Sequence, residues 1–109
     1  MKNGLIVNSS GTKRWYKEGK LHREDGSAVE YTDGDKEWYK EGKRHREDGP
    51  AIEDADGYKA WYKEGIRHRE DGPAIESYYG HKVYYYNGEK IECNSTEEFI
   101  RLVNLKVFW

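Results

Sequence analysis

Three stretches of the chain set a histidine, an arginine and two acidic residues side by side, and these residue types serve acid–base catalysis and metal binding. They read HREDGSAVE at 22–30, HREDGPAIE at 45–53 and HREDGPAIE at 68–76. Acid–base hydrolysis needs carboxylates of different pKa in one cleft, and a metal ion needs several ligands around it. Equivalent residues two strands apart lie about 9.6 Å from each other, too far to share an ion. We therefore expect a protein that is not an enzyme, with no catalytic residue, metal site or cofactor.

Because the motif recurs, a turn carrying an ordered set of charges explains it better. An Asp before Gly, as in Asp48-Gly49, bonds backbone amides while the glycine takes a left-handed conformation. Arg46 is placed to reach a carboxylate of the next unit, and His45 to pack against an aromatic strand and bond the backbone. These loops also present residue types that are enriched in binding hot spots. With the tyrosines of neighbouring strands they form the candidate binding surface: Tyr16, Tyr39, Tyr62, Tyr85, His22, Arg23, His45, Arg46, His68 and Arg69.

The elements that position these loops repeat every 23 residues. Trp15, Trp38, Trp61 and Tyr84 mark the period. Eleven of the 12 glycines fall into three phases of the same period, and glycines kept in phase indicate backbone positions at positive φ. We place the repeats at these aromatic residues, with the fourth repeat partial, and treat residues 1–109 as one repeat domain.

Each unit contains two short segments rich in aromatic or β-branched residues, such as 36–40 (KEWYK) and 50–54 (PAIED), which are typical of half-buried strands. The Asp56-Gly57 pair is a strong signal for a two-residue hairpin loop. Such a loop pairs Ile52 with Trp61, whereas a three-residue loop shifts the register by one. The equivalent pairs are Val29–Trp38, Ile6–Trp15 and Ile75–Tyr84. One face then carries Trp and Ile, and the other carries Tyr among Lys, Glu and Ala.

The C-terminal segment loses the loop motif and reads NSTEEFIRLVNLKVFW from position 94. Ser95 or Thr96 followed by two glutamates indicates a helix start, and apolar residues from Phe99 onward recur at helical spacing. We expect a helix over about 96–106 that folds onto the Trp–Ile face or closes the end of the sheet. The predicted fold class is all-β: a single-layer antiparallel β-meander of 23-residue hairpin repeats with a C-terminal capping α-helix.

Composition and charge favour a small, folded and soluble protein. The 109 residues are 35% hydrophobic and 37% charged, but aromatic residues at 15% supply surface for a thin core. The net charge of −2 gives no overall attraction to nucleic acid or to an anionic membrane. Cys93 is the one cysteine, which fits a reducing compartment, and the apolar run at 5–7 is too short for a signal peptide or a membrane span. We expect a cytoplasmic location and no membrane partner.

The 23-residue unit resembles the MORN repeat. Residues 31–45 (YTDGDKEWYKEGKRH) match that repeat's turn, aromatic strand, second turn and histidine, and the resemblance spans about residues 3–109. It implies a single-layer sheet of successive hairpins and a role in assembly or protein binding, sometimes with lipid association. Where MORN units continue with Gly-x-Gly, this chain has a longer and more charged loop. That variant is similar to repeats in bacteriophage and large-virus proteins.

Residues and resemblance together lead us to expect a non-enzymatic protein-binding module, a small phage accessory protein that binds and inhibits a host defence protein in the host cytoplasm. A homodimer through a sheet edge or face is a second expected kind of partner. The alternative is a nucleotide or nucleic-acid binder that stacks bases on a face of Tyr and Lys. The glutamates that follow those lysines and the negative net charge count against it.

Overall fold

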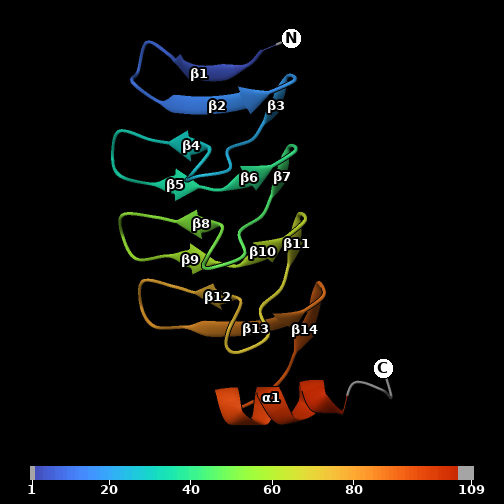
Figure 1. Ribbon diagram of the computed structural model, residues 1–109. Coiled ribbons are helices and arrows are strands. Elements are labelled where there is room, and N and C mark those ends of the chain that lie inside the picture. The colour runs from blue at the N-terminus through green and yellow to red at the C-terminus, as the bar shows by residue number, and fades with distance from the viewer. Residues whose placement is uncertain (1, 106–109) are drawn as a thin grey trace.

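The computed structural model describes residues 2–105, which form an antiparallel β-meander followed by one short helix (Figure 1). The strands are β1 (Gly4–Val7), β2 (Lys13–Lys17), β3 (Lys20–Leu21), β4 (Val29–Glu30), β5 (Lys36–Glu37), β6 (Tyr39–Lys40), β7 (Lys43–Arg44), β8 (Ile52–Glu53), β9 (Lys59–Ala60), β10 (Tyr62–Lys63), β11 (Ile66–Arg67), β12 (Ile75–Glu76), β13 (Lys82–Tyr86) and β14 (Glu89–Ile91), and α1 is Thr96–Asn104. The main sheet keeps chain order from β1 to β14 and does not close into a barrel. The expected all-β meander with a C-terminal helix is confirmed.

The hairpins at the Asp-Gly turns have three-residue loops, so the predicted cross-strand pairs are wrong by one residue. The N–H of Asp54 donates to the carbonyl of Tyr58 across the loop at 2.9 Å, and Gly57 takes a φ of 101°. This arrangement is a type I turn followed by a left-handed glycine. The observed pairs are Ile52–Ala60, Val29–Glu37, Ile6–Arg14 and Ile75–Val83.

The two-residue turns lie at the Glu-Gly pairs instead. Glu41 and Gly42 join Lys40 to Lys43 and have φ values of 50° and 82°, so both central residues are left-handed, as a type I′ turn requires. Glutamate rarely adopts this conformation, which explains why the sequence signal was weaker here than at Asp-Gly. The equivalent left-handed residues are Glu18, Glu64 and Asn87.

The shifted register changes which side chains share a face. The N–H of Trp38 donates to the carbonyl of Ala51 at 2.7 Å, so each Trp lies beside a small, fully buried alanine. Because side chains alternate along a strand, the aliphatic residues point to the opposite face with the tyrosines. The prediction that Trp shares a face with Ile is therefore wrong. We name the two sides the Trp face (Trp15, Trp38, Trp61 with Ala28, Ala51, Ala74) and the Tyr face (Tyr16, Tyr39, Tyr62, Tyr85 with Val29, Ile52, Ile75).

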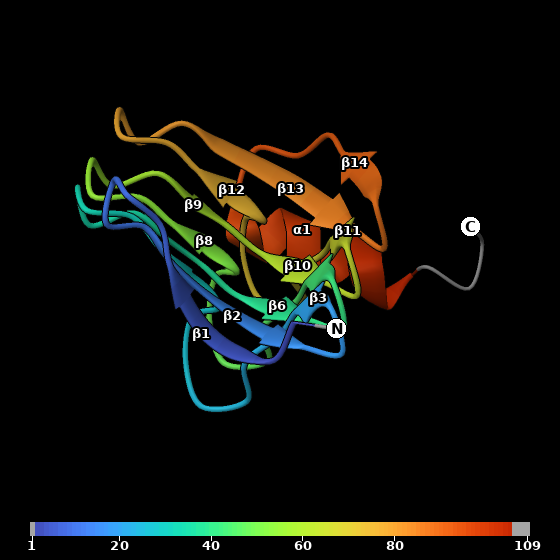
Figure 2. The same cartoon turned by 90° about the horizontal axis from the view of Figure 1, so that it is seen from above.

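In the second and third repeats the strand of the main sheet ends at the central Trp, and the strand that follows this Trp pairs in a separate ribbon. β5 ends just before Trp38 and β6 begins just after it, and β6–β7 forms a separate two-stranded ribbon, as does β10–β11. The ribbons stack along one side of the sheet (Figure 1), and from above the hairpin turns of successive units lie over one another (Figure 2). Backbone bonds join neighbouring ribbons, for example from the Gly42 N–H to the Leu21 carbonyl at 2.8 Å.

Helix α1 closes the β14 end of the sheet. Phe99 is fully buried and lies 5.0 Å, ring to ring, from Tyr84, and Val103 and Tyr86 complete this small core. Ser95 caps the helix by accepting the N–H of Glu98 at 3.1 Å. The predicted start is confirmed.

The helix ends at Asn104, with Leu105 in a turn. The last predicted helical residue, Lys106, lies outside the described residues.

Candidate functional site

Each HREDG loop is organised by its arginine. The guanidinium of Arg46 lies 3.8 Å from the centroid of the Trp38 ring. Its Nη1 donates to the Pro50 carbonyl at 3.1 Å and to Glu53 at 2.6 Å, and its Nε donates to Asp48 at 3.1 Å. A planar fork of donors over an aromatic ring is specific to arginine. The equivalent arginines in the neighbouring units are Arg23 and Arg69.

These contacts close each unit on itself, so the predicted bridge from Arg46 to the next unit is wrong. Glu53 belongs to the same 23-residue unit as Arg46. Asp48 accepts from the arginine rather than from the backbone amides that we expected. At Gly49 φ is not positive, and an added Cβ would lie 2.9 Å from the Arg46 Cζ. A glycine is therefore needed here because the guanidinium occupies the space that a side chain would fill. The prediction of a left-handed conformation, made from the 23-residue recurrence of this glycine, is wrong.

The histidines connect successive units. The Nδ1 of His45 accepts the backbone N–H of Glu64 at 2.9 Å, and its Nε2 lies 2.8 Å from the carboxylate of Glu47. Since Nδ1 is the acceptor, the neutral ring carries its hydrogen on Nε2 and donates it to Glu47. The predicted backbone bond of the histidine is confirmed, and in the third repeat His68 packs against Tyr86, with ring centroids 4.8 Å apart. The other two links run from Glu41 to His22 and from Asn87 to His68.

The histidine bonds tune the exposed carboxylates beside them. The hydrogen bond from His45 lowers the pKa of Glu47, and the nearby charge of Lys63 lowers it further. The hydrogen bond from His22 lowers the pKa of Glu24 in the same way. Both carboxylates therefore stay charged at mildly acidic pH.

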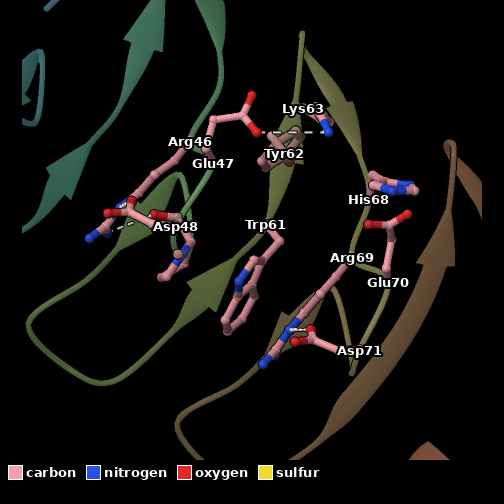
Figure 3. Close-up of a pocket in the computed structure, with 12 residues that line it drawn as sticks. Arg46, Glu47, Asp48, Trp61, Tyr62, Lys63, His68, Arg69, Glu70 and Asp71 are labelled. Carbon is pink, nitrogen blue, oxygen red and sulfur yellow. Dashed lines mark hydrogen bonds and ion pairs between the residues drawn. The ribbon is translucent and has the colours of Figure 1, made fainter. Parts of the chain in front are cut away.

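Two matching grooves open on the Trp face between consecutive loops. One, of about 600 Å³, lies between loops 46–50 and 68–71 with Trp61 between its walls (Figure 3). The other, of about 660 Å³, has the same relation to Trp38 and lies between loops 23–26 and 45–48. The first groove is lined by four carboxylates and three cations other than histidine.

The exposed part of these grooves is more acidic than the full set of residues that line them. The side chain of Arg46 is only 21% exposed because it lies on its tryptophan, whereas its partner Asp48 is 87% exposed. In the next loop Arg69 is 23% exposed and Asp71 82%. Each loop therefore withdraws its arginine and displays its acids. The resulting acidic rim consists of Glu24, Asp25, Glu47, Asp48, Glu70 and Asp71.

The tyrosines of the candidate surface form a ladder with arginines on the Tyr face, and Tyr39 and Tyr62 also line the grooves. Arg44 lies 5.9 Å from the Tyr39 ring centroid and 5.6 Å from that of Tyr62. Arg67 continues the ladder to Tyr85 at 5.3 Å. Burial and the hydrogen bond to Glu37 also raise the pKa of Tyr39 to about 12. Because these ring faces already contact cations, base stacking would have to displace them, which disfavours the nucleotide alternative.

The lysines lie apart from that ladder. Lys40 and Lys63 line the grooves, and Lys63 approaches Glu47 at 3.8 Å. Tyr16, at the N-terminal end, has Lys2 at 5.0 Å from its ring centroid.

The single thiol is not activated. Burial raises the pKa of Cys93, and the charge of Glu98 raises it further, so the thiol stays protonated. Within residues 2–105 no three His, Cys, Asp or Glu side chains are placed to hold a metal ion. The same residues contain no helix long and apolar enough to cross a membrane.

Comparisons with models of protein families, with curated proteins and with solved structures found no match. The resemblance to the MORN repeat thus rests on motifs such as 31–45 and stays a prediction. Fold and loops together define the class of protein as a linear array of β-hairpins, with matching grooves repeated along one face.

Sequence reasoning missed the glutamates that hold the loop arginines and the arginines that cover the tyrosines. Glu30, Glu53 and Glu76 recur at the 23-residue period, as do Arg44 and Arg67, so their phase was available as a signal. The residues that they contact could not be predicted, because the strand pairing depends on the three-residue loops. The acids of the rim were recognised as parts of the motif. The sequence did not show that these acids are exposed whereas the arginines of the same loops are mostly buried.

Proposed function

We propose that this protein is a non-enzymatic binding module whose partner is another protein, contacted through the two grooves of the Trp face. The observation that carries this is the division of each loop into a withdrawn arginine and exposed acids around a half-buried tryptophan. Trp and Arg are common hot-spot residues, and an exposed acidic rim complements a basic surface. The partner therefore presents Lys or Arg side chains, spaced by about 10 Å to match consecutive grooves.

The similarity of the repeats to those of bacteriophage and large-virus proteins extends the proposal. The module acts as an accessory viral protein in the cytoplasm of the host, where it binds a host defence protein and blocks it. Blocking needs only occupancy of a surface, which suits a rigid sheet without a deep cleft.

The test is affinity capture from bacterial lysate with charge-matched variants. Asp48→Asn with Asp71→Asn removes two rim charges but keeps the oxygens that accept from Arg46 and Arg69. The control, Asp33→Asn with Asp56→Asn, removes two charges at the hairpin tips and keeps the oxygens that accept backbone N–H groups there.

The native chain and the tip variant should retain one stoichiometric protein that the rim variant loses, and rising salt should weaken capture. Equal capture by all three chains would contradict the proposed surface. Capture of nucleic acid instead of protein would contradict the proposed class of partner.

A further inference from the structure

The strand at the end of the sheet opposite to the helix differs from every other strand described. β1 carries Leu5, Ile6 and Val7 at 48%, 40% and 52% exposure, and its outer edge is uncovered among residues 2–105 (Figure 1). Each of the other described strands contains at least one Lys, Arg or Glu, whereas β1 contains none. Edge strands normally carry charge to prevent pairing with another chain, so this array leaves its open edge unprotected.

The repeat itself shows that this edge is built to receive a strand. The equivalent strands inside the array have a neighbour on both sides: β4 lies between β2 and β5, β8 between β5 and β9, and β12 between β9 and β13. β1 occupies the same phase but has only β2 beside it. The far end of the sheet cannot supply the missing neighbour, because α1 packs there.

We propose that β1 pairs antiparallel with β1 of a second copy, so that two arrays join into one continuous sheet with a helix at each end. The N–H of Asn8 donates to the carbonyl of Thr12, the residue before β2, so by alternation Ile6 also bonds to β2 while Leu5 and Val7 direct their backbone groups to the open edge. Opposite Leu5, Trp15 donates its own N–H to the carbonyl of Ala28, the residue before β4, which agrees with this alternation.

This alternation fixes the register of the dimer. With the two-fold axis at Ile6, Leu5 of one copy and Val7 of the other exchange backbone hydrogen bonds, and Ile6 faces its own counterpart in the closer, non-hydrogen-bonded position. Every apolar side chain of the strand then meets an apolar partner. The uncharged segment 3–12 brings no like charges together. The helices at both outer ends stop further growth, so the product is a dimer and not a fibre.

A charge variant tests the dimer. Ile6→Glu places a carboxylate opposite Arg14 within its own chain, which favours the hairpin, but directly opposite a second carboxylate in the dimer. The matched control is Ile66→Glu, at a residue 50% exposed and opposite Lys63 in its ribbon. In sedimentation experiments, the apparent mass of the native chain and of the control should rise with concentration from 12.9 kDa toward twice that value. The apparent mass of Ile6→Glu should stay at that of the monomer.

Cysteine variants in a Cys93→Ser background test the register. Ile6→Cys should form a disulfide-linked dimer under mild oxidation, because counterparts opposite each other have Cβ atoms about 4.5–5.5 Å apart. Leu5→Cys, of similar exposure, faces Val7 of the other copy and should cross-link far less. A native chain that stays monomeric overturns the proposal, as does a dimer unaffected by Ile6→Glu or cross-linked equally at both positions. The grooves lie outside β1 and β2, so this outcome is independent of partner binding.

Discussion

His45 and Glu64 lie in successive repeats and are joined by a hydrogen bond of 2.9 Å from the backbone N–H of Glu64 to the imidazole Nδ1. Glu64 is left-handed, with a φ of 50°, so the histidine of one unit holds the strained turn residue of the next. The motif that looked like an active site thus sets the stacking of the units. Its acids lie exposed at the rim, with Glu47 at 68% and Asp48 at 87% side-chain exposure.

Replacing this histidine should destabilise the array. His45→Ala loses the acceptor for Glu64 and the packing of a ring whose side chain is only 11% exposed, and should lower the free energy of unfolding by about 1–2 kcal/mol. His45→Asn keeps an acceptor near Nδ1 and should lose less. The exposed His81 provides the control, since His81→Ala should leave the urea midpoint unchanged. Equal midpoints for His45→Ala and the native chain would refute the link.

The turn residue can be tested from its own side. A left-handed glutamate is strained, whereas asparagine tolerates this conformation, and the fourth repeat already has Asn87 at φ 49°. Glu64→Asn should therefore stabilise the protein by roughly 0.5–1 kcal/mol, measured by urea unfolding. Asn87→Glu should lower the free energy of unfolding by a similar amount. The turn assignment is wrong if both substitutions shift stability in the same direction.

Arg46 and Gly49 should be strongly coupled. Gly49→Ala puts a Cβ 2.9 Å from the Arg46 Cζ, and the guanidinium cannot move easily because Trp38, Glu53 and Pro50 hold it. The substitution should cost about 1–3 kcal/mol alone and close to nothing in an Arg46→Ala background. A double-mutant cycle of unfolding free energies measures the coupling, and additive costs would show that the arginine does not occupy this position.

The protein should become less stable at acidic pH, because the glutamates that accept hydrogen bonds from histidines become protonated. The pKa of Glu47 is lowered from 4.5 in the folded protein, so its contribution is complete above 4.5 and is lost as the pH falls through the lower folded value. Glu24 follows the same rule. Melting temperatures between pH 7 and pH 3 should drop less for Glu24→Gln with Glu47→Gln than for the native chain. Glu89→Gln, at an exposed position of β14, serves as the charge control, and parallel profiles for all three would remove these carboxylates from the explanation.

Local patterns were enough to predict the architecture. The 23-residue spacing of Trp15, Trp38 and Trp61 and the short β-forming segments gave the meander, and Ser95 with the following glutamates gave the helix start. The register was not predictable with the same rules, because Asp-Gly fits both a two-residue and a three-residue loop. One residue of difference moved every aliphatic side chain to the opposite face.

The sequence by itself determined a repeated, antiparallel array with a helical end, because periodic strand and turn signals act locally and each unit repeats them. It also determined that a His–Arg–acid loop recurs in every full repeat. Only the tertiary structure decided what that loop displays. Arg46 lies on Trp38 and bonds Glu53, and these contacts bury the positive charge while Asp48 stays in solvent. A nearly neutral motif therefore becomes an acidic rim, since exposure depends on which groups find partners across strands, and that pairing follows from a register that the sequence leaves open.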